Sequence, residues 1–103
     1  MSIPRGTTPT ITLTIDDETI DLTQALGVYV TFSRRGNTVT KTGTDLTIDE
    51  NTIEVTLSQQ ETLAFSDGPV EVQANWTYAG GARCATEIAS VDLSRQLLER
   101  VIE

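Results

Sequence analysis

The sequence contains no histidine and only one cysteine, Cys84, and these shortages exclude several kinds of chemistry. Histidine is the commonest general base and the commonest metal ligand, so both roles lose their usual residue. A single cysteine cannot form an intrachain disulfide, and one cysteine without histidine cannot assemble a zinc site. We therefore expect no bound cofactor and a fold held by its hydrophobic core.

Basic residues are also scarce, since 7 Lys and Arg stand against 15 Asp and Glu, a formal net charge of −8. Binding to nucleic acid or to an anionic membrane surface requires clustered cations, so we expect neither partner. Apolar runs stay well below the length of a transmembrane helix, and residues 1–6 lack the apolar core of a signal peptide. These features predict synthesis in the cytoplasm without export.

A period-two alternation of apolar and polar residues is the strongest pattern present. It is typical of strands with one buried face, and threonine, the commonest residue, suits the solvated face. The 103 residues suffice for one domain, which we assign to 1–103 with a lead over 1–9. The clearest strands cover residues 10–15, 28–33, 52–57 and 70–78, the last being the longest and so the most central.

Turn residues recur every eight to twelve positions and separate about seven strands. Residues 34–37 and Gly80 with Gly81 predict hairpins, with Gly36 and Asn37 supplying positive φ. Further assignments are an extended segment at 19–23, an edge strand at 38–42, a hairpin joining 45–48 to 52–57, and a β-bulge near Ala89 and Ser90. The fold class predicted is all-β, an antiparallel β-sandwich of the immunoglobulin-like type.

Two segments depart from the strand pattern. Ser58 and Glu61 have the spacing of a capping box, which predicts one helical turn between strands. Residues 94–103 are predicted to form a short amphipathic helix or a tail, capped by Ser94 and supported by an Arg95–Glu99 pair. Its apolar stripe is a candidate interface for assembly or for docking on the sandwich, formed by Leu93, Leu97, Leu98, Val101 and Ile102.

Candidate catalytic or metal-binding side chains are few. Two acidic groups occur in apparent turns, where carboxylates are usually solvated: Asp16, Asp17, Glu18 and Asp21, and Asp45, Asp49 and Glu50. Neither has the spacing of a calcium loop. Cys84 shares a strand phase with Ile88 and has no histidine partner, so we interpret it as a small buried hydrophobe. The sequence therefore predicts a protein that is not an enzyme.

Aromatic residues are the remaining candidates for ligand binding. Trp76, Tyr78 and Tyr29 could form a platform for sugars if they were exposed on one face. Trp76, however, is in phase with the apolar residues Val70 and Val72, which favours a place in the core. Tyr29 points opposite to its apolar neighbours and is expected to be exposed.

Residues 5–13, RGTTPTITL, resemble the opening of short proteins encoded by prophage-like regions of Gram-positive gut bacteria, in which aspartate stands at the place of Thr7. The likeness continues through 28–33 (VYVTFS), 57–65 (LSQQETLAF) and 70–73 (VEVQ). The early strands are also similar to the N-terminal domain of phage baseplate upper proteins. None of these motifs is catalytic, and residues 90–103 fit the likeness only loosely.

The resemblance implies a structural protein of a phage tail or baseplate. We therefore expect a protein-interaction module whose partners are other phage structural proteins or a second copy, located in the virion or a phage-like particle after synthesis. A second hypothesis is an immunoglobulin-like module that binds carbohydrate or a cell surface through exposed aromatic residues.

Overall fold

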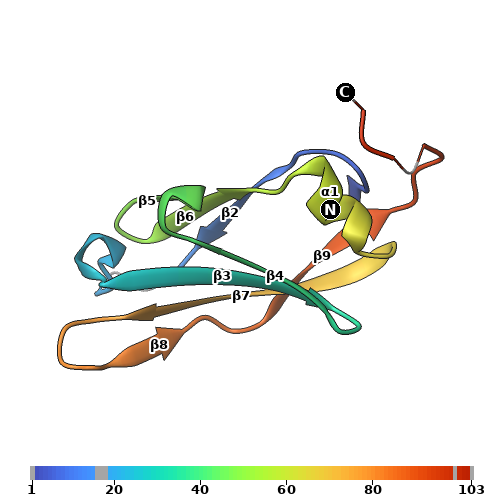
Figure 1. The fold of residues 1–103 in the computed structure, drawn as a ribbon. Helices are drawn as coiled ribbons and strands as arrows, with labels where there is room; N and C mark the ends of the chain where they lie inside the picture. The colour runs from blue at the N-terminus through green and yellow to red at the C-terminus, as the bar shows by residue number, and fades with distance from the viewer. Residues whose placement is uncertain (1, 16–18, 99, 103) are drawn as a thin grey trace.

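The structure, a computed structural model, describes residues 2–15, 19–98 and 100–102 and is mostly β (Figure 1). The described strands are β1 (Ser2–Pro4), β2 (Thr10–Thr14), β3 (Gly27–Arg34), β4 (Asn37–Thr42), β5 (Leu46–Ile48), β6 (Thr52–Thr56), β7 (Gly68–Thr77), β8 (Arg83–Ala85) and β9 (Ala89–Ser94). Three short helices join them: η1 (Leu22–Gln24), η2 (Gly43–Asp45) and α1 (Gln59–Ala64).

The strands form two sheets. The larger sheet has the order β1-β9-β7-β3-β4, with β8 also paired to β7, and the smaller has the order β2-β6-β5. Figure 1 shows the smaller sheet lying over one face of the larger. The edge position predicted for residues 38–42 is confirmed by β4, and the central position of residues 70–78 by β7, which pairs with β3, β8 and β9.

The prediction of a purely antiparallel sandwich is wrong at one strand. β1 pairs in parallel with β9, with Ile3 opposite Leu93, so the larger sheet is mixed. The sequence assigns these residues to the lead because three residues, the last of them Pro4, are too few to show a period. The main-chain N–H of Arg5 extends the pairing by donating to the carbonyl of Ser94, 3.0 Å away.

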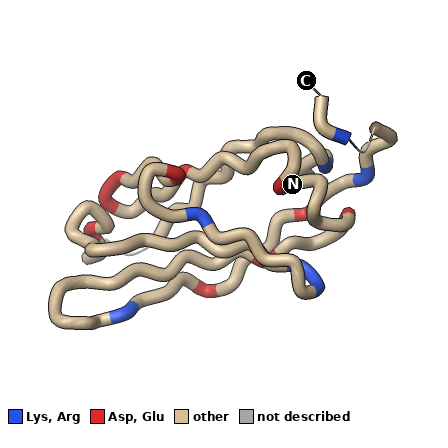
Figure 2. Tube along the Cα trace, viewed as in Figure 1, with Lys and Arg blue, Asp and Glu red and all other residues tan. Residues whose placement is uncertain are grey.

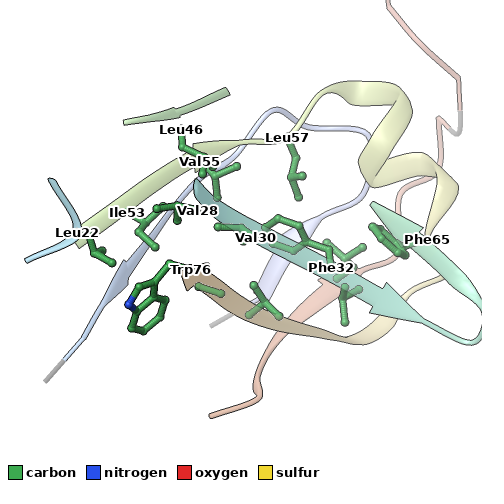
Figure 3. Close-up of a cluster of buried hydrophobic side chains, with 14 residues drawn as sticks. Leu22, Val28, Val30, Phe32, Leu46, Ile53, Val55, Leu57, Phe65 and Trp76 are labelled. Atoms are coloured by element: carbon green, nitrogen blue, oxygen red, sulfur yellow. The ribbon is translucent and has the colours of Figure 1, made fainter. Parts of the chain in front are cut away.

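The core lies between the two sheets and is built from the predicted strand phases (Figure 3). Val28, Val30 and Phe32 of β3 face the core, as do Val70, Val72, Ala74 and Trp76 of β7. From the smaller sheet, Ile53 and Val55 of β6 and Leu57 just after it face the core. The side chains that alternate with these residues on β3 and β7 are exposed or half-buried. The period-two pattern therefore predicts the buried face of each main strand correctly.

The β3–β4 hairpin turns over two residues with positive φ, Arg35 at 48° and Gly36 at 88°, as a type I′ turn requires. The sequence correctly predicts the hairpin but assigns one positive φ to Asn37, which is instead the first residue of β4. The hairpin predicted at Gly80 and Gly81 is confirmed, and both glycines have positive φ.

Residues 19–23 do not extend as predicted, because Leu22–Gln24 forms η1. The Asp21 side chain accepts a hydrogen bond from the main-chain N–H of Thr23, so a local side-chain cap replaces strand pairing. Leu22 is buried, and its N–H donates to the carbonyl of Glu50 at 2.7 Å. The segment thus closes one end of the core.

A bulge separates β8 from β9, as the change of phase predicts, although it lies just before Ala89. Ala85 is opposite Asn75 and Ala89 is opposite Val72, so three residues of this strand face two of β7. Thr86 fills the gap, because its N–H donates to the Ala74 carbonyl at 2.9 Å and its hydroxyl accepts from the Ala74 N–H at 3.0 Å.

The helical turn predicted between strands is confirmed by α1. Ser58 Oγ accepts from the Glu61 N–H at 3.2 Å, and Glu61 Oε1 accepts from the Ser58 N–H at 2.7 Å. Thr62 is fully buried and donates to the Thr7 carbonyl at 2.9 Å. Arg5 donates to the carbonyls of Leu63 and Phe65. The N-terminal segment is therefore fastened to α1.

Glu61 gives the fold a pH-dependent contribution. Burial alone would raise the pKa of its carboxyl group, but hydrogen bonds from Lys41 and the Ser58 N–H, with the charge of Lys41 at 2.8 Å, lower the pKa below its ordinary value. A carboxylate with a lowered pKa in the folded state stabilises the fold above its unfolded pKa, about 4.3 for Glu. That stabilisation is lost as the pH falls through the folded pKa.

We expect Glu61→Gln to destabilise the protein near neutral pH, where the carboxylate is ionised, and the difference from the wild type to shrink as the pH falls below the unfolded pKa of about 4.3. Glutamine can still close the capping box, so only the charge is removed. Urea unfolding of both proteins across this range measures the difference, with Glu54→Gln on the exposed face of β6 as control. A difference that stays constant with pH contradicts the prediction.

Of the two alternatives predicted for 94–103, a helix or a tail, the helix is wrong, since residues 94–98 and 100–102 contain no helical turn. Ser94 is the last residue of β9 and no helical turn follows it in the described residues, while Leu93 is buried against the core. Too few residues then remain for a helix to persist without a packing surface. The predicted Arg95–Glu99 pair involves a residue outside the described part of the chain.

Candidate interaction surfaces

The predicted interface stripe is divided by the structure between the core and the surface. Leu93 is buried, whereas Leu97 is 90% exposed, Ile102 62% and Leu98 47%. Val101 is half-buried. Exposed apolar side chains that lie close together mark a site of interaction more often than single ones do. The C-terminal segment, residues 95–102, is therefore the first candidate surface.

The C-terminal segment lies beside α1, beyond the end of β9 (Figure 1). The side chain of Gln59 holds it there, because its Oε1 accepts from the Ile102 N–H at 2.7 Å and its Nε2 donates to the Ile102 carbonyl at 3.1 Å. These bonds are exposed, so they fix the segment weakly and leave its leucines in water.

Acidic and basic residues are interspersed along the molecule (Figure 2). The Leu22–Glu50 bond brings the turn of Asp21 close to the turn of Asp49 and Glu50 at the end of the molecule that holds η1. The basic residues Arg95 and Arg100 follow β9 in the chain. The C-terminal segment therefore carries two arginines.

The acidic candidates form no metal centre among residues 19–98 and 100–102, where no group of three or more possible ligands occurs. Asp21 accepts hydrogen bonds from Thr23, and Asp49 Oδ1 accepts from the Glu50 N–H at 2.8 Å. Asp16, Asp17 and Glu18 lie outside the described residues. Local turn hydrogen bonds thus account for the carboxylates that are described.

We expect thermal melts in EDTA and in about 1 mM calcium chloride to coincide, because a ligand raises stability only when it binds the folded state. Differential scanning fluorimetry of the full chain measures both, and magnesium at equal ionic strength controls for screening. A rise of several degrees with calcium alone contradicts this expectation and points to the turns at 16–21 or 49–51.

The three aromatic residues do not form a platform. Trp76 is 2% exposed and belongs to the core, as its phase predicts, while Tyr78 is half-buried and packs against the core. Tyr29 is 46% exposed on the outer face of the larger sheet. It borders a shallow depression of about 310 Å³ with Asn75 and Arg83, whose Nη2 donates to Asn75 Oδ1 at 3.3 Å.

A larger cleft of about 610 Å³, which we call the β2–β8 cleft, opens between the two sheets. Leu13 and Ile15 line it from β2 and the residue after it, and Cys84 of β8 and Glu87 of the bulge that follows line it from the larger sheet. Trp76 of β7 also lines it. Cys84 packs against the core but is half-buried rather than buried as the sequence predicts, and Ile88, which the sequence places in the same phase, is 60% exposed.

Trp76 leaves one polar group without a partner at this cleft. Its Nε1–H is buried and has no hydrogen-bond acceptor. Buried tryptophan N–H groups usually find one, because an unpaired buried donor is costly. No sequence signal indicates the cleft, since residues from both sheets form it and only their stacking brings them together.

Comparison with known proteins gives no match, either to the models of protein families or to curated proteins. Within the described part of the chain, no helix is long and apolar enough to cross a membrane.

Proposed function

We propose that this protein is a structural module of a phage or prophage-derived tail or baseplate, which works by protein–protein contact. Its fold in this proposal is an immunoglobulin-like sandwich, and its place is the virion or a phage-like particle. The observation that carries the proposal is the exposed apolar C-terminal segment, with Leu97 90% and Ile102 62% exposed. A domain that keeps such side chains in water gains stability when a partner covers them.

The chemistry of the chain supports a role without catalysis. There is no histidine in the sequence, and the single cysteine is half-buried in the β2–β8 cleft. A nucleophile with an adjacent base, the usual requirement for covalent catalysis, cannot be named among the described residues. The similarity of residues 5–13, 28–33 and 57–65 to small prophage-encoded proteins supplies the particle context.

Particles released from the source strain provide the test. We expect an antibody against this chain to label purified particles in electron microscopy, and the chain to co-sediment with them. Leu97→Asp with Leu98→Asp should reduce incorporation at least tenfold, because two charges would have to be buried. Leu26→Asp, which replaces a leucine that is 73% exposed elsewhere, is the matched control. A chain found only in the supernatant contradicts the proposal.

Tyr29 favours a second candidate function, the binding of carbohydrate or a cell surface. Its ring is the exposed aromatic on the larger sheet, next to polar groups of Asn75 and Arg83. Sugars stack on such rings and hydrogen-bond to polar neighbours. A glycan array tests this function, with Tyr29→Ala as the variant that must lose binding. An array without signal leaves the structural role as the better account.

A further inference from the structure

Two strand edges open onto the β2–β8 cleft. Within residues 2–15, 19–98 and 100–102, β2 pairs only with β6 and β8 pairs only with β7. β1 covers the outer edge of β9 only at Asp92–Ser94, so residues 83–91 keep one edge free. Free strand edges present main-chain N–H and C=O groups that can pair with another strand. The main chain that borders this cleft is thus ready to receive an extended peptide.

The interior of the cleft also suits an extended peptide with apolar side chains. Apolar residues such as Leu13, Ile15 and Ile20 line it, and its volume of about 610 Å³ falls in the range of about 300–1,000 Å³ in which proteins hold small ligands. Figure 3 shows the indole of Trp76 at one end of the core, with its nitrogen on the side away from Val30 and Phe32. Trp76 lines the cleft, and a main-chain carbonyl that reached its buried N–H would supply the acceptor that this group lacks.

Charge narrows the choice of peptide. Glu87 lines the cleft, and no Lys or Arg does so among the described residues. The whole protein carries a net charge of −8, so it repels an acidic peptide. A peptide with as many acidic as basic residues is repelled less and can approach the cleft more easily. Residues 95–103 meet this condition, because Arg95 and Arg100 balance Glu99 and Glu103.

The C-terminal segment also has the other required properties. It forms no helix or strand in its described residues, and it offers exposed Leu97, Leu98 and Ile102 for an apolar cleft. Gln59 holds it beside α1, whereas the cleft borders β8 toward the other end of a molecule that is 47 Å long. Segment and cleft thus occupy separate surfaces of one molecule and can engage two neighbours at once.

We propose that the β2–β8 cleft receives the C-terminal segment of a second copy of this chain by strand addition. Residues 97–102 of one copy pair with a free edge and offer a carbonyl to Trp76 Nε1–H. Leu98 and Ile102, which share one face of an extended strand, enter the cleft among its apolar residues. The inference rests on the proposed function as an assembly module, and it identifies the surface that the C-terminal segment binds. Strand addition of this kind gives affinity through the main chain and specificity through pockets for side chains.

This contact joins unlike surfaces. A head-to-tail contact of unlike surfaces builds an open chain or a ring, whereas a contact of identical patches stops at a dimer. Two variants of the full chain therefore separate the surfaces. Ala89→Arg blocks the cleft, which the exposed residue Ala89 lines, and Leu97→Asp with Leu98→Asp disables the segment. All three positions are exposed, so both variants should fold, and a thermal melt of each checks this.

Light scattering gives the decisive measurement. We expect the wild-type mass to rise with concentration above the 11.2 kDa monomer, and each variant alone to remain monomeric. An equimolar mixture of the two variants should form a dimer and stop there, because it contains one intact cleft and one intact segment per pair. Leu26→Asp should assemble like the wild type.

NMR of the indole group gives an independent measurement. Trp76 is the only tryptophan, so its Nε1–H gives one resonance, which should move downfield as the wild type assembles and stay fixed in Ala89→Arg. If Ala89→Arg assembles like the wild type, the segment binds elsewhere and the inference is wrong, while the structural role stands. The inference is also wrong if the wild type stays monomeric with a fixed indole resonance. It is wrong as well if the indole resonance is shifted to the same extent at every protein concentration, because the segment then binds the cleft of its own copy. The antibody labelling of purified particles then tests the proposed role in a tail or baseplate independently of this inference.

Discussion

Replacing Trp76 by alanine should lower the free energy of unfolding by about 3 kcal/mol, the lower end of the range of about 3–5 for large aromatic residues in a core. The indole is 2% exposed, and its residue lies between Val28 of β3 and Cys84 of β8. Removal leaves a cavity that joins the β2–β8 cleft. The lower end applies because the variant also loses the unpaired Nε1–H, whose burial costs the wild type free energy.

Urea unfolding of the variant and the wild type measures this loss. Glu71→Ala, on the outward face of the same strand, is the matched control and should change stability by less than about 0.5 kcal/mol. The wild-type emission of the single tryptophan should be blue-shifted in the native state and move to longer wavelength on unfolding. Equal emission from native and denatured protein would contradict the buried position of Trp76.

Phe32→Ala should be at least as costly, about 3–5 kcal/mol. The side chain is 1% exposed and lies opposite Val72 of β7 and Val39 of β4, at the middle of the core. Phe65 and Leu57 border the same space, so the end of α1 and the smaller sheet lose contacts together. The substitution therefore weakens the contact between the two sheets.

Tyr29 offers a control within β3. It is an aromatic residue on the same strand, but it points to the outer face and is 46% exposed. Tyr29→Ala should change the free energy of unfolding by less than about 1 kcal/mol, since the ring loses little buried area. Similar losses for the two variants would show that β3 does not alternate between core and solvent.

Local patterns in the sequence predicted the elements that depend on neighbouring residues alone. Val28, Val30 and Phe32 alternate with polar residues, and a pleated strand turns such residues to one face wherever it pairs. Ser58 and Glu61 close their capping box within one helical turn. The change of phase after Cys84 indicated the bulge, because an extra residue shifts every later side chain to the other face.

Elements that depend on distant residues were not predictable in this way. β1 exists because Ser2–Pro4 meets β9, and three residues carry no period of their own. The helical spacing of Leu93, Leu97 and Val101 is real, but Leu93 gains more by packing in the core than by starting a short helix. The segment at 19–23 has two apolar residues at strand spacing, and only its position over the end of the core makes Leu22 part of η1.

The sequence by itself determined the all-β class, the buried face of each main strand, the place of Trp76 in the core and the exposure of Tyr29. These follow from side-chain alternation, which every strand imposes on its own residues. Only the tertiary structure decided which edges stay free, how the β2–β8 cleft opens beside an unpaired indole N–H, and where the C-terminal segment leaves the fold. Each of these depends on how strands far apart in the chain are stacked, and no local period records that arrangement.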